Sequence, residues 1–165
     1  MPKKVAGKGR YIRVGIFQLD EVLPYVFTKE IRHQLRKSGV SYKSKEWKAV
    51  SKRSYPAVID GEIKRVMVSM GSHRYQLFAK KGIKCVTCGI KGLFFALERG
   101  RGDNPNKYHF NLYGKSRSGR EIMITKDHIL PRSKGGRNRL TNYQPMCYRC
   151  NQKKSNKVPD VKSTT

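Results

Sequence analysis

The sequence predicts an α+β fold. Short apolar runs separated by turn residues favour strands through much of the chain. Two short segments near the N-terminus show the spacing of amphipathic helices. Two Cys-x-x-Cys pairs, Cys85 with Cys88 and Cys147 with Cys150, predict a metal site that joins two distant segments. With 165 residues, the chain has room for one domain or for a small domain with an appended module.

Residues 1–13 are predicted to be a flexible basic arm. They contain two glycines and five cations, Lys3, Lys4, Lys8, Arg10 and Arg13. Such an arm could follow a phosphate backbone, or it could simply keep the protein in solution.

A first folded module, with mixed helix and strand, is predicted over residues 14–71. Thr28 is a suitable N-cap for one helix, and a second short helix is expected within 44–52. Asp60-Gly61, between two apolar runs, predicts the tight turn of a hairpin. Two short basic helices also fit a DNA-binding helix-turn-helix, although any small α+β module would give the same pattern.

A second module is predicted over 72–157, followed by a disordered tail over 158–165. It should begin with a helix capped by Ser72. Leu93–Leu97 and Tyr108–Tyr113 are apolar and predict strands. A further short strand, Ile122 to Ile124, leads into the motif described below.

The charge of the chain favours a polyanionic partner. Lys and Arg number 37 against 11 Asp and Glu, which gives a formal net charge of +26. This excess is larger than solubility requires, and it would draw the protein onto nucleic acid.

Neither a membrane span nor a secretory signal is expected. No apolar run approaches the roughly 18 residues that a span requires. The N-terminal Met-Pro-Lys-Lys lacks an apolar segment after it. We therefore expect an intracellular protein, in which cysteines rarely form disulfides.

The two cysteine pairs predict a structural zinc ion. A two-residue spacer lets both thiolates of a pair face one ion, and two pairs complete a tetrahedral site. Because all four ligands would be Cys, no coordination position stays open for catalysis. Four independent buried cysteines would be the alternative, and the paired spacing argues against it.

The segment 122–154 combines a carboxylate, an imidazole and two amides. Asp127 and His128 follow the short apolar strand, Asn142 follows a glycine-containing loop, and Asn151 follows the second cysteine pair. If this segment folds as strand, loop, strand and helix, these side chains meet and could bind one hard divalent cation.

This motif resembles the HNH nuclease family. Four pieces fall in the family's order: D-H-I-x-P, S-K-G-G, N-x-Q-P-M-C and C-N-x-x-K. His128, Asn142 and Asn151 stand at the family's usual spacing, although many members have His in place of Asn151. The resemblance extends over 72–157 and implies a small zinc-clipped ββα-metal core, a β-hairpin and a helix around one metal. Residues 14–71 would be an N-terminal α+β extension of that core.

The resemblance also implies a function, hydrolysis of DNA phosphodiester bonds. His128 would be the general base, Asp127 and Asn151 would bind Mg²⁺ or Mn²⁺, and Asn142 would hold the loop that orients His128. The metal would stabilise the leaving 3′ oxygen. Small nucleases of this family are frequent in phages and mobile elements. Four cations flank the motif and could hold DNA phosphates: Lys134, Arg137, Lys153 and Lys154.

Two other functions fit part of these observations. A non-catalytic, zinc-containing nucleic-acid-binding protein would account for the charge and the cysteines, but not for the spacing of His128, Asn142 and Asn151. A family member without activity, used to recognise DNA structure, would differ from a nuclease only in lacking catalysis.

Overall fold

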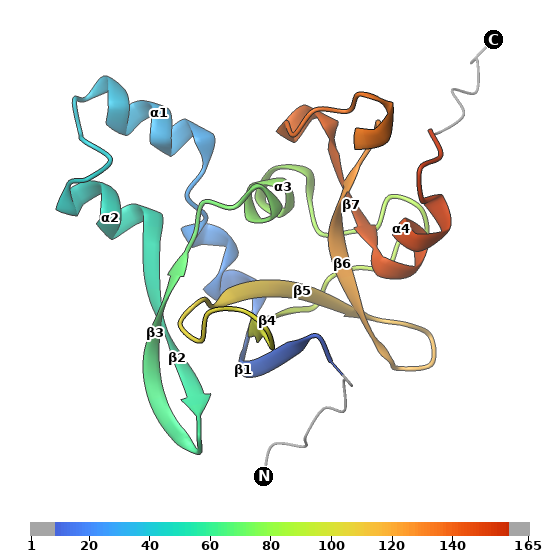
Figure 1. The fold of residues 1–165 in the computed structure, drawn as a ribbon, viewed down its shortest axis with the longest axis horizontal. Coiled ribbons are helices and arrows are strands. Elements are labelled where there is room, and N and C mark those ends of the chain that lie inside the picture. Colours follow the sequence, from blue (N-terminus) through green and yellow to red (C-terminus); the bar gives the residue numbers. More distant parts are fainter. Residues whose placement is uncertain (1–8, 159–165) are drawn as a thin grey trace. The chain divides into compact units, whose positions relative to one another are not determined.

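The computed structural model describes residues 9–158, and these form two compact units (Figure 1). Among them, unit 1 comprises 9–71 and 94–111, and unit 2 comprises 72–93 and 112–158. Residues 94–111, which we expected in the second module, therefore cluster with the N-terminal segment. Of the predicted tail, only Val158 lies within the described residues.

Unit 1 contains an antiparallel sheet. Strand β1 (Tyr11–Phe17) pairs with β4 (Phe94–Gly100), and the first residues of β5 (His109–Lys115) come next in the strand order. Because β1 begins at Tyr11, the expected flexible arm cannot reach residue 13. Residues 1–8 lie outside the described part of the chain.

Aromatic rings form the centre of unit 1. Phe17 lies edge-on to Tyr55 and to Phe110, with ring centroids 5.2 and 5.5 Å apart. Next to this core, the buried carboxylate of Glu98 accepts hydrogen bonds from Arg13 (3.0 Å) and Asn111 (2.7 Å). This buried charge is thus paired, as a carboxylate in an apolar environment must be.

Two short helices follow β1, after the 3-10 turns Leu19–Glu21 and Leu23–Tyr25. They are α1 (Lys29–Lys37) and α2 (Lys45–Ser51), and each begins one residue after a capping side chain. The Thr28 hydroxyl accepts from Ile31 N, and the Ser44 hydroxyl accepts from Trp47 N, each at 3.2 Å.

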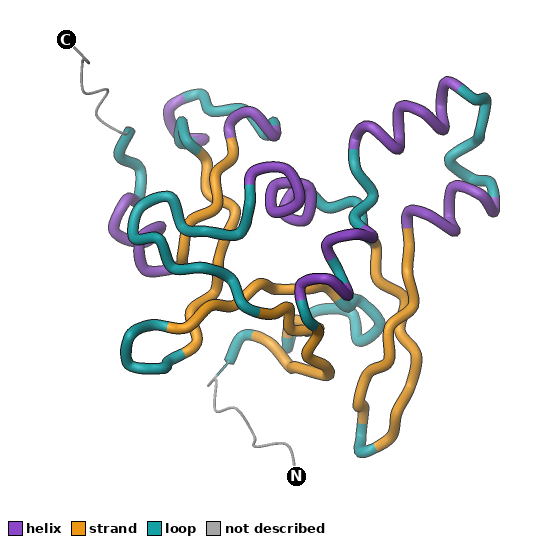
Figure 2. Tube along the Cα trace, turned by 180° about the vertical axis from the view of Figure 1, so that it is seen from behind, coloured by secondary structure: helices purple, strands orange, loops and turns teal. Residues whose placement is uncertain are grey.

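A long two-stranded ribbon completes unit 1 (Figures 1 and 2). Strands β2 (Lys52–Ile59) and β3 (Glu62–Ser69) pair antiparallel around the predicted Asp60-Gly61 turn. Both turn residues have positive φ, 52° and 80°, as the favoured two-residue hairpin turn requires. One ribbon face packs inward, while Val58 and Ile63 on the other are exposed.

Unit 2 is built from α3, two full strands, the end of β5 and a last helix. Helix α3 (His73–Lys81) begins after the Ser72 cap and buries Leu77 and Phe78. In the strand order, the last residues of β5 are followed by β6 (Glu121–His128) and β7 (Tyr143–Cys147). Helix α4 (Tyr148–Lys154) follows β7 directly.

The strand we expected at residues 122–124 is therefore longer, and Asp127 and His128 are its last two residues. The loop between β6 and β7 contains the 3-10 turns Arg132–Lys134 and Leu140–Asn142. Together the two units confirm the predicted α+β class. Among residues 9–158, no helix has the length and apolar character to cross a membrane.

Candidate active site

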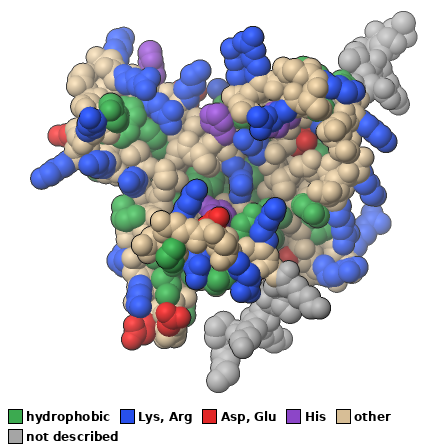
Figure 3. All heavy atoms as spheres, viewed as in Figure 1, with side chains coloured by type: hydrophobic (Ala, Val, Ile, Leu, Met, Phe, Trp, Pro, Cys, Tyr) green, Lys and Arg blue, Asp and Glu red, His purple; other side chains and the backbone are tan. Residues whose placement is uncertain are grey.

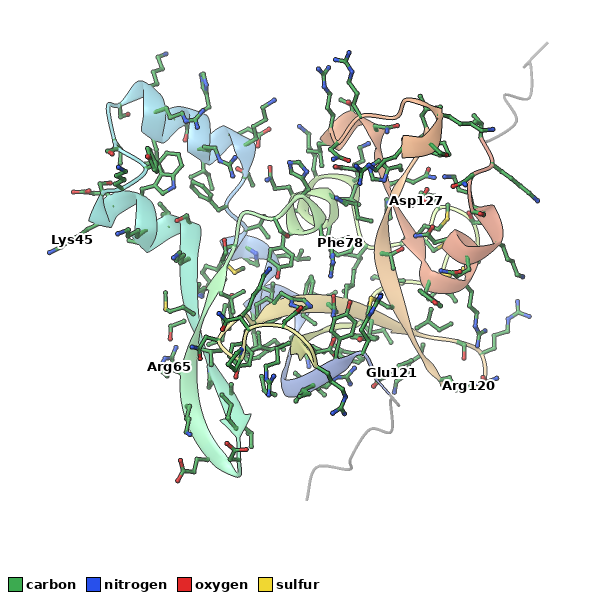
Figure 4. All side chains as sticks on the ribbon, in the orientation of Figure 1. Lys45, Arg65, Phe78, Arg120, Glu121 and Asp127 are labelled. Atoms are coloured by element: carbon green, nitrogen blue, oxygen red, sulfur yellow. The ribbon has the colours of Figure 1, made fainter. Side chains whose placement is uncertain are left out.

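The Asp127 carboxylate lies at the end of β6 and is almost fully buried (Figure 4). In the β6–β7 register, Asp127 is opposite Gln144, whose side-chain amide donates to Oδ2 at 2.8 Å. Lys154 of α4 places its Nζ 3.0 Å from the same oxygen. A buried carboxylate that accepts from an amide and an ammonium is held in one orientation, with its charge balanced.

The His128 ring lies on the other side of β6, since neighbouring strand residues point to opposite faces. Its Nε2 is 2.8 Å from the side-chain oxygen of Asn138, which lies in the loop after β6. Tyr143, opposite His128 in the register, meets the imidazole edge-on at 4.9 Å between ring centroids. With Nε2–H donating to Asn138, the Nδ1 lone pair is the one that could accept a proton.

Asn142 ties the β6–β7 loop together. Its side-chain oxygen accepts from Leu130 N at 2.9 Å, and its amide nitrogen donates to the carbonyls of Leu130 and Arg137, both at 3.1 Å. Three hydrogen bonds from one side chain therefore fix Leu130 and Arg137, the residue that precedes Asn138. The side chain of Asn142 therefore acts on His128 through the loop.

Glycine is required at two positions of this loop for different structural reasons. Gly135 adopts φ of 86°, a left-handed conformation that favours glycine. At Gly136, a Cβ would overlap the carbonyl of Leu130, so only hydrogen fits there.

Asn151 lies in the middle of α4, where its side chain reaches back to β6. Its amide nitrogen donates to the Thr125 hydroxyl at 2.9 Å. Lys154, one helical turn later on the same face, also donates to the carbonyl of His128 at 2.6 Å. Both side chains therefore fix α4 against β6, and the amide oxygen of Asn151 is the atom that could serve a cation.

An open hollow of about 240 Å³ joins these groups. Burial lowers the pKa of Lys126, and the neighbouring Arg74 and Arg132 lower it further, so several cations converge here. Such a hollow attracts an anion. Its lining is formed by Lys126, Asp127, His128, Pro131, Arg132, Ser133, Asn151, Lys154, Ser155 and Asn156.

The four cysteines form a separate cluster in unit 2. All are free thiols, and their sulfur atoms lie within 4.8 Å of one another, a grouping that could hold a metal ion. The two pairs come from the 85–88 turn and from the β7–α4 junction. These segments are also joined by a hydrogen bond from Val86 N to the carbonyl of Pro145, at 3.0 Å.

The thiols of this cluster differ in acidity. Burial opposes ionisation of Cys85, but backbone hydrogen bonds from Cys88 and Cys147 outweigh it, and the pKa of Cys85 is lowered to about 7. Burial raises the pKa of Cys147 and of Cys150. Four thiolates this close would repel one another strongly, so full ionisation of the cluster needs a bound cation.

Asp127, His128 and Asn151 all line the hollow, with Asp127 and His128 approaching it from opposite sides of the end of β6. Asn142 does not line the hollow and instead holds the loop after β6. Of the four flanking cations, Lys154 lines the hollow and pairs with Asp127. The other three, Lys134, Arg137 and Lys153, are exposed and do not line it.

Sequence reasoning missed several residues of the site. Gln144 and Asn138 contact the two central side chains directly, and Lys126 and Arg132 line the hollow. Gln144 meets Asp127 through the β6–β7 register, which no spacing in the sequence gives. Asn138 lies in an irregular loop, and no helical or strand periodicity in the sequence marks it as a site residue.

Comparison with known proteins gives one match. Residues 115–163 match the model of a family described as HNH endonuclease. Searches of curated proteins and of solved structures found no match. The matched segment contains β6, β7, α4 and the whole Asp127 hollow, which supports nuclease activity in general terms. Residues 115–163 of this chain are therefore similar to the HNH endonuclease family.

Proposed function

We propose that this chain is a metal-dependent DNA endonuclease that hydrolyses phosphodiester bonds. The observation that supports it most is the convergence of Asp127, His128 and Asn151 on one cation-lined hollow, within the segment that matches the family. A binding protein without catalysis would need the cations of this hollow, but not a buried carboxylate beside an oriented imidazole.

The donor atoms at the hollow fit a hard divalent cation. Asp127 offers a carboxylate and Asn151 an amide oxygen, ligands that Mg²⁺ and Mn²⁺ prefer. The charge of Asp127 is balanced by the ammonium of Lys154 at 3.0 Å, and a bound cation would take over that role. When bound, the metal would stabilise negative charge on the phosphate and on the leaving 3′ oxygen.

The remaining chemistry falls to side chains. His128 would take the proton from the attacking water, because an imidazole accepts a proton near neutral pH. Asn138 would hold the ring with Nδ1 available, and Tyr143 would limit its rotation. Lys126 and Arg132 would attract the DNA phosphates. By family resemblance, the products would have 5′-phosphate and 3′-hydroxyl ends.

The cysteine cluster fits zinc. With a Zn–S distance of about 2.3 Å, tetrahedral sulfur ligands lie about 3.8 Å apart. The Cys88 and Cys147 sulfur atoms are 3.7 Å apart. Because four sulfurs leave no open position, this zinc would be structural.

The test is cleavage of supercoiled plasmid by the purified chain with Mg²⁺, with Mn²⁺ and without added divalent cation. We expect nicked or linear DNA with the added cations, and ends that a DNA ligase can rejoin. Plasmid that stays supercoiled in every condition, while the protein binds it, would favour the non-catalytic alternative. A second arm offers single-stranded and branched DNA, so that a structural preference is not mistaken for inactivity.

A further inference from the structure

Helix α1 of unit 1 has a basic face. Its cations and its histidine recur at positions i, i+3, i+4, i+7 and i+8, the spacing that lines up side chains on one side of a helix. We call this set the α1 stripe; it consists of Lys29, Arg32, His33, Arg36 and Lys37. All residues of α1 are exposed or half-buried, and Glu30 is the only acidic residue among its nine.

Two arginines of the α1 stripe are ordered by aromatic rings. The Arg32 guanidinium lies 5.4 Å from the centroid of Phe27, and that of Arg36 lies 6.0 Å from Trp47. Trp47 and Phe27 in turn meet edge-on at 5.3 Å. Arginines stacked in this way lose less conformational entropy when they bind a phosphate.

Helix α2 and the connecting loop extend the basic surface. Lys45 and Lys48 are exposed and lie one turn apart, whereas Trp47 between them is buried. In the loop, Tyr42 is 65% exposed, with the ammonium of Lys43 5.6 Å from its ring. Figure 3 shows Lys and Arg side chains gathered over α1 and α2, and Lys45 extends outward in Figure 4. An exposed aromatic ring among cations is typical of nucleic-acid interfaces.

The ribbon of the same unit has a different charge. Asp60 lies in its turn and Glu62 directly after it, and both would repel phosphates. Figure 3 shows acidic side chains at this end of the ribbon. Lys64 on β3 lies 3.6 Å from Glu62, and Arg65 donates to the hydroxyl and the carbonyl of Ser54. Lys64 and Arg65 of the ribbon are therefore partly neutralised or already bonded, whereas α1 carries four cations and one acidic residue, Glu30.

We propose that the α1 stripe binds the sugar–phosphate backbone of double-stranded DNA and anchors the chain independently of the hollow in unit 2. A nine-residue helix is about 13 Å long, which matches roughly four phosphates of one strand. The choice of DNA as the polyanion rests on the proposed nuclease function. The binding itself rests only on the charge and order of the stripe.

The experiment compares two triple variants that remove the same charge. Lys29→Gln/Arg36→Gln/Lys37→Gln removes three cations of the α1 stripe. The control, Lys64→Gln/Lys107→Gln/Lys115→Gln, removes three exposed cations from separate places. Binding of a short labelled DNA duplex is measured by fluorescence anisotropy over a range of salt concentrations. No divalent cation is added, so the result does not depend on whether the chain cuts DNA.

We expect the stripe variant to bind at least about tenfold more weakly, and the slope of log K against log salt to fall by about 2 to 3. The control should change affinity by less than about threefold, because scattered charges act only through the general field. Equal affinities and slopes for the two variants would overturn the proposal, as would a loss seen with duplex RNA but not with DNA.

Thermal unfolding of both variants checks that the fold is intact. Should the loss of Arg36 from Trp47 destabilise unit 1, the exposed pair Lys29→Gln/Lys37→Gln takes its place, with Lys64→Gln/Lys107→Gln as control. A plasmid assay that finds no cleavage by the wild type would reject the nuclease proposal and leave this comparison unaffected.

Discussion

The cysteine cluster and the Asp127 hollow both include residues of α4, Cys150 in the cluster and Asn151 and Lys154 in the hollow, yet their donor atoms are chemically opposite. The cluster offers four sulfur atoms within 4.8 Å and no position for another ligand. The hollow offers oxygen donors from Asp127 and Asn151, is open to solvent and is lined by cations. A closed site of soft sulfur ligands suits a structural metal ion. An open site of hard oxygen ligands suits a catalytic metal ion, which must also bind the substrate.

Cys147 connects the cluster to the helix that supplies part of the hollow. This residue ends β7, and its sulfur accepts from Cys150 N at the start of α4, at 3.5 Å. Helix α4 then presents Asn151 and Lys154 to β6. We therefore expect loss of the cluster to disrupt the hollow, whereas changes in the hollow should have little effect on the cluster.

The largest effect should come from Cys88→Ser. Structural zinc contributes on the order of 10 kcal/mol to the folding of small zinc domains, so loss of one ligand should unfold much of unit 2. Elemental analysis should find about one zinc per wild-type chain and far less in the variant, whose thermal transition should broaden or vanish. The neighbouring exposed Thr87→Ser is the control. A folded, zinc-free wild type would contradict the role given to the cluster.

His128→Ala should affect the hollow alone. Loss of a general base typically slows a reaction by about 10²- to 10⁴-fold. Zinc content, thermal unfolding and DNA affinity should stay at wild-type values, because the His128 side chain is half-exposed and is not one of the cysteine ligands. Plasmid nicking rates measure the effect, with the exposed Gln152→Ala of α4 as control. Cleavage at the wild-type rate would mean that His128 is not the base.

Lys154→Gln should remove the positive charge that balances the Asp127 carboxylate. Removing one partner of a buried ion pair costs roughly 3 kcal/mol, since the other charge is left uncompensated. We therefore expect a lower thermal midpoint without metal and a larger stabilisation by Mn²⁺ than in the wild type. The adjacent Lys153→Gln, with an exposed side chain, should show neither change. If both variants are stabilised equally by Mn²⁺, Lys154 does not influence metal binding at Asp127.

The smallest effect is expected for Asn138→Ala. Without the hydrogen bond to Nε2, the imidazole can rotate, and kcat should fall by about tenfold. KM should stay unchanged, because Asn138 does not line the hollow, and that split distinguishes positioning from substrate binding. Asn138→Ser, which keeps a hydroxyl acceptor, should recover part of kcat. A rise in KM alone would assign Asn138 to DNA binding instead.

Local signals in the sequence predicted much of the framework. Thr28, Ser44 and Ser72 each cap a helix through a bond to the backbone three residues later, and such contacts depend on neighbouring residues only. The Asp60-Gly61 turn is equally local. The pairing of β1 with β4, about eighty residues later, depends on long-range packing. The residue pattern of either strand does not indicate which strand it pairs with.

The same limit applies to the site. The motif singled out Asp127, His128 and Asn151, which do reach one hollow, and their catalytic roles stay predictions. Gln144 and Lys154 meet Asp127 only because of the β6–β7 register and the docking of α4. Register is a property of the folded hairpin, so no spacing in the sequence could give these contacts.

The ribbon of unit 1 has a consequence for how copies of this chain behave at high concentration. Each of its strands has a neighbour on one side only, and Val58 and Ile63 stand exposed, at 53% and 79%, on a face without cover in the described structure. Such strands invite edge-to-edge association. Pro56 interrupts the row of N–H groups on β2, and the net charge of +26 keeps copies apart. We therefore expect solubility to fall when polyanions or high salt neutralise that repulsion, and Pro56→Val to aggregate first.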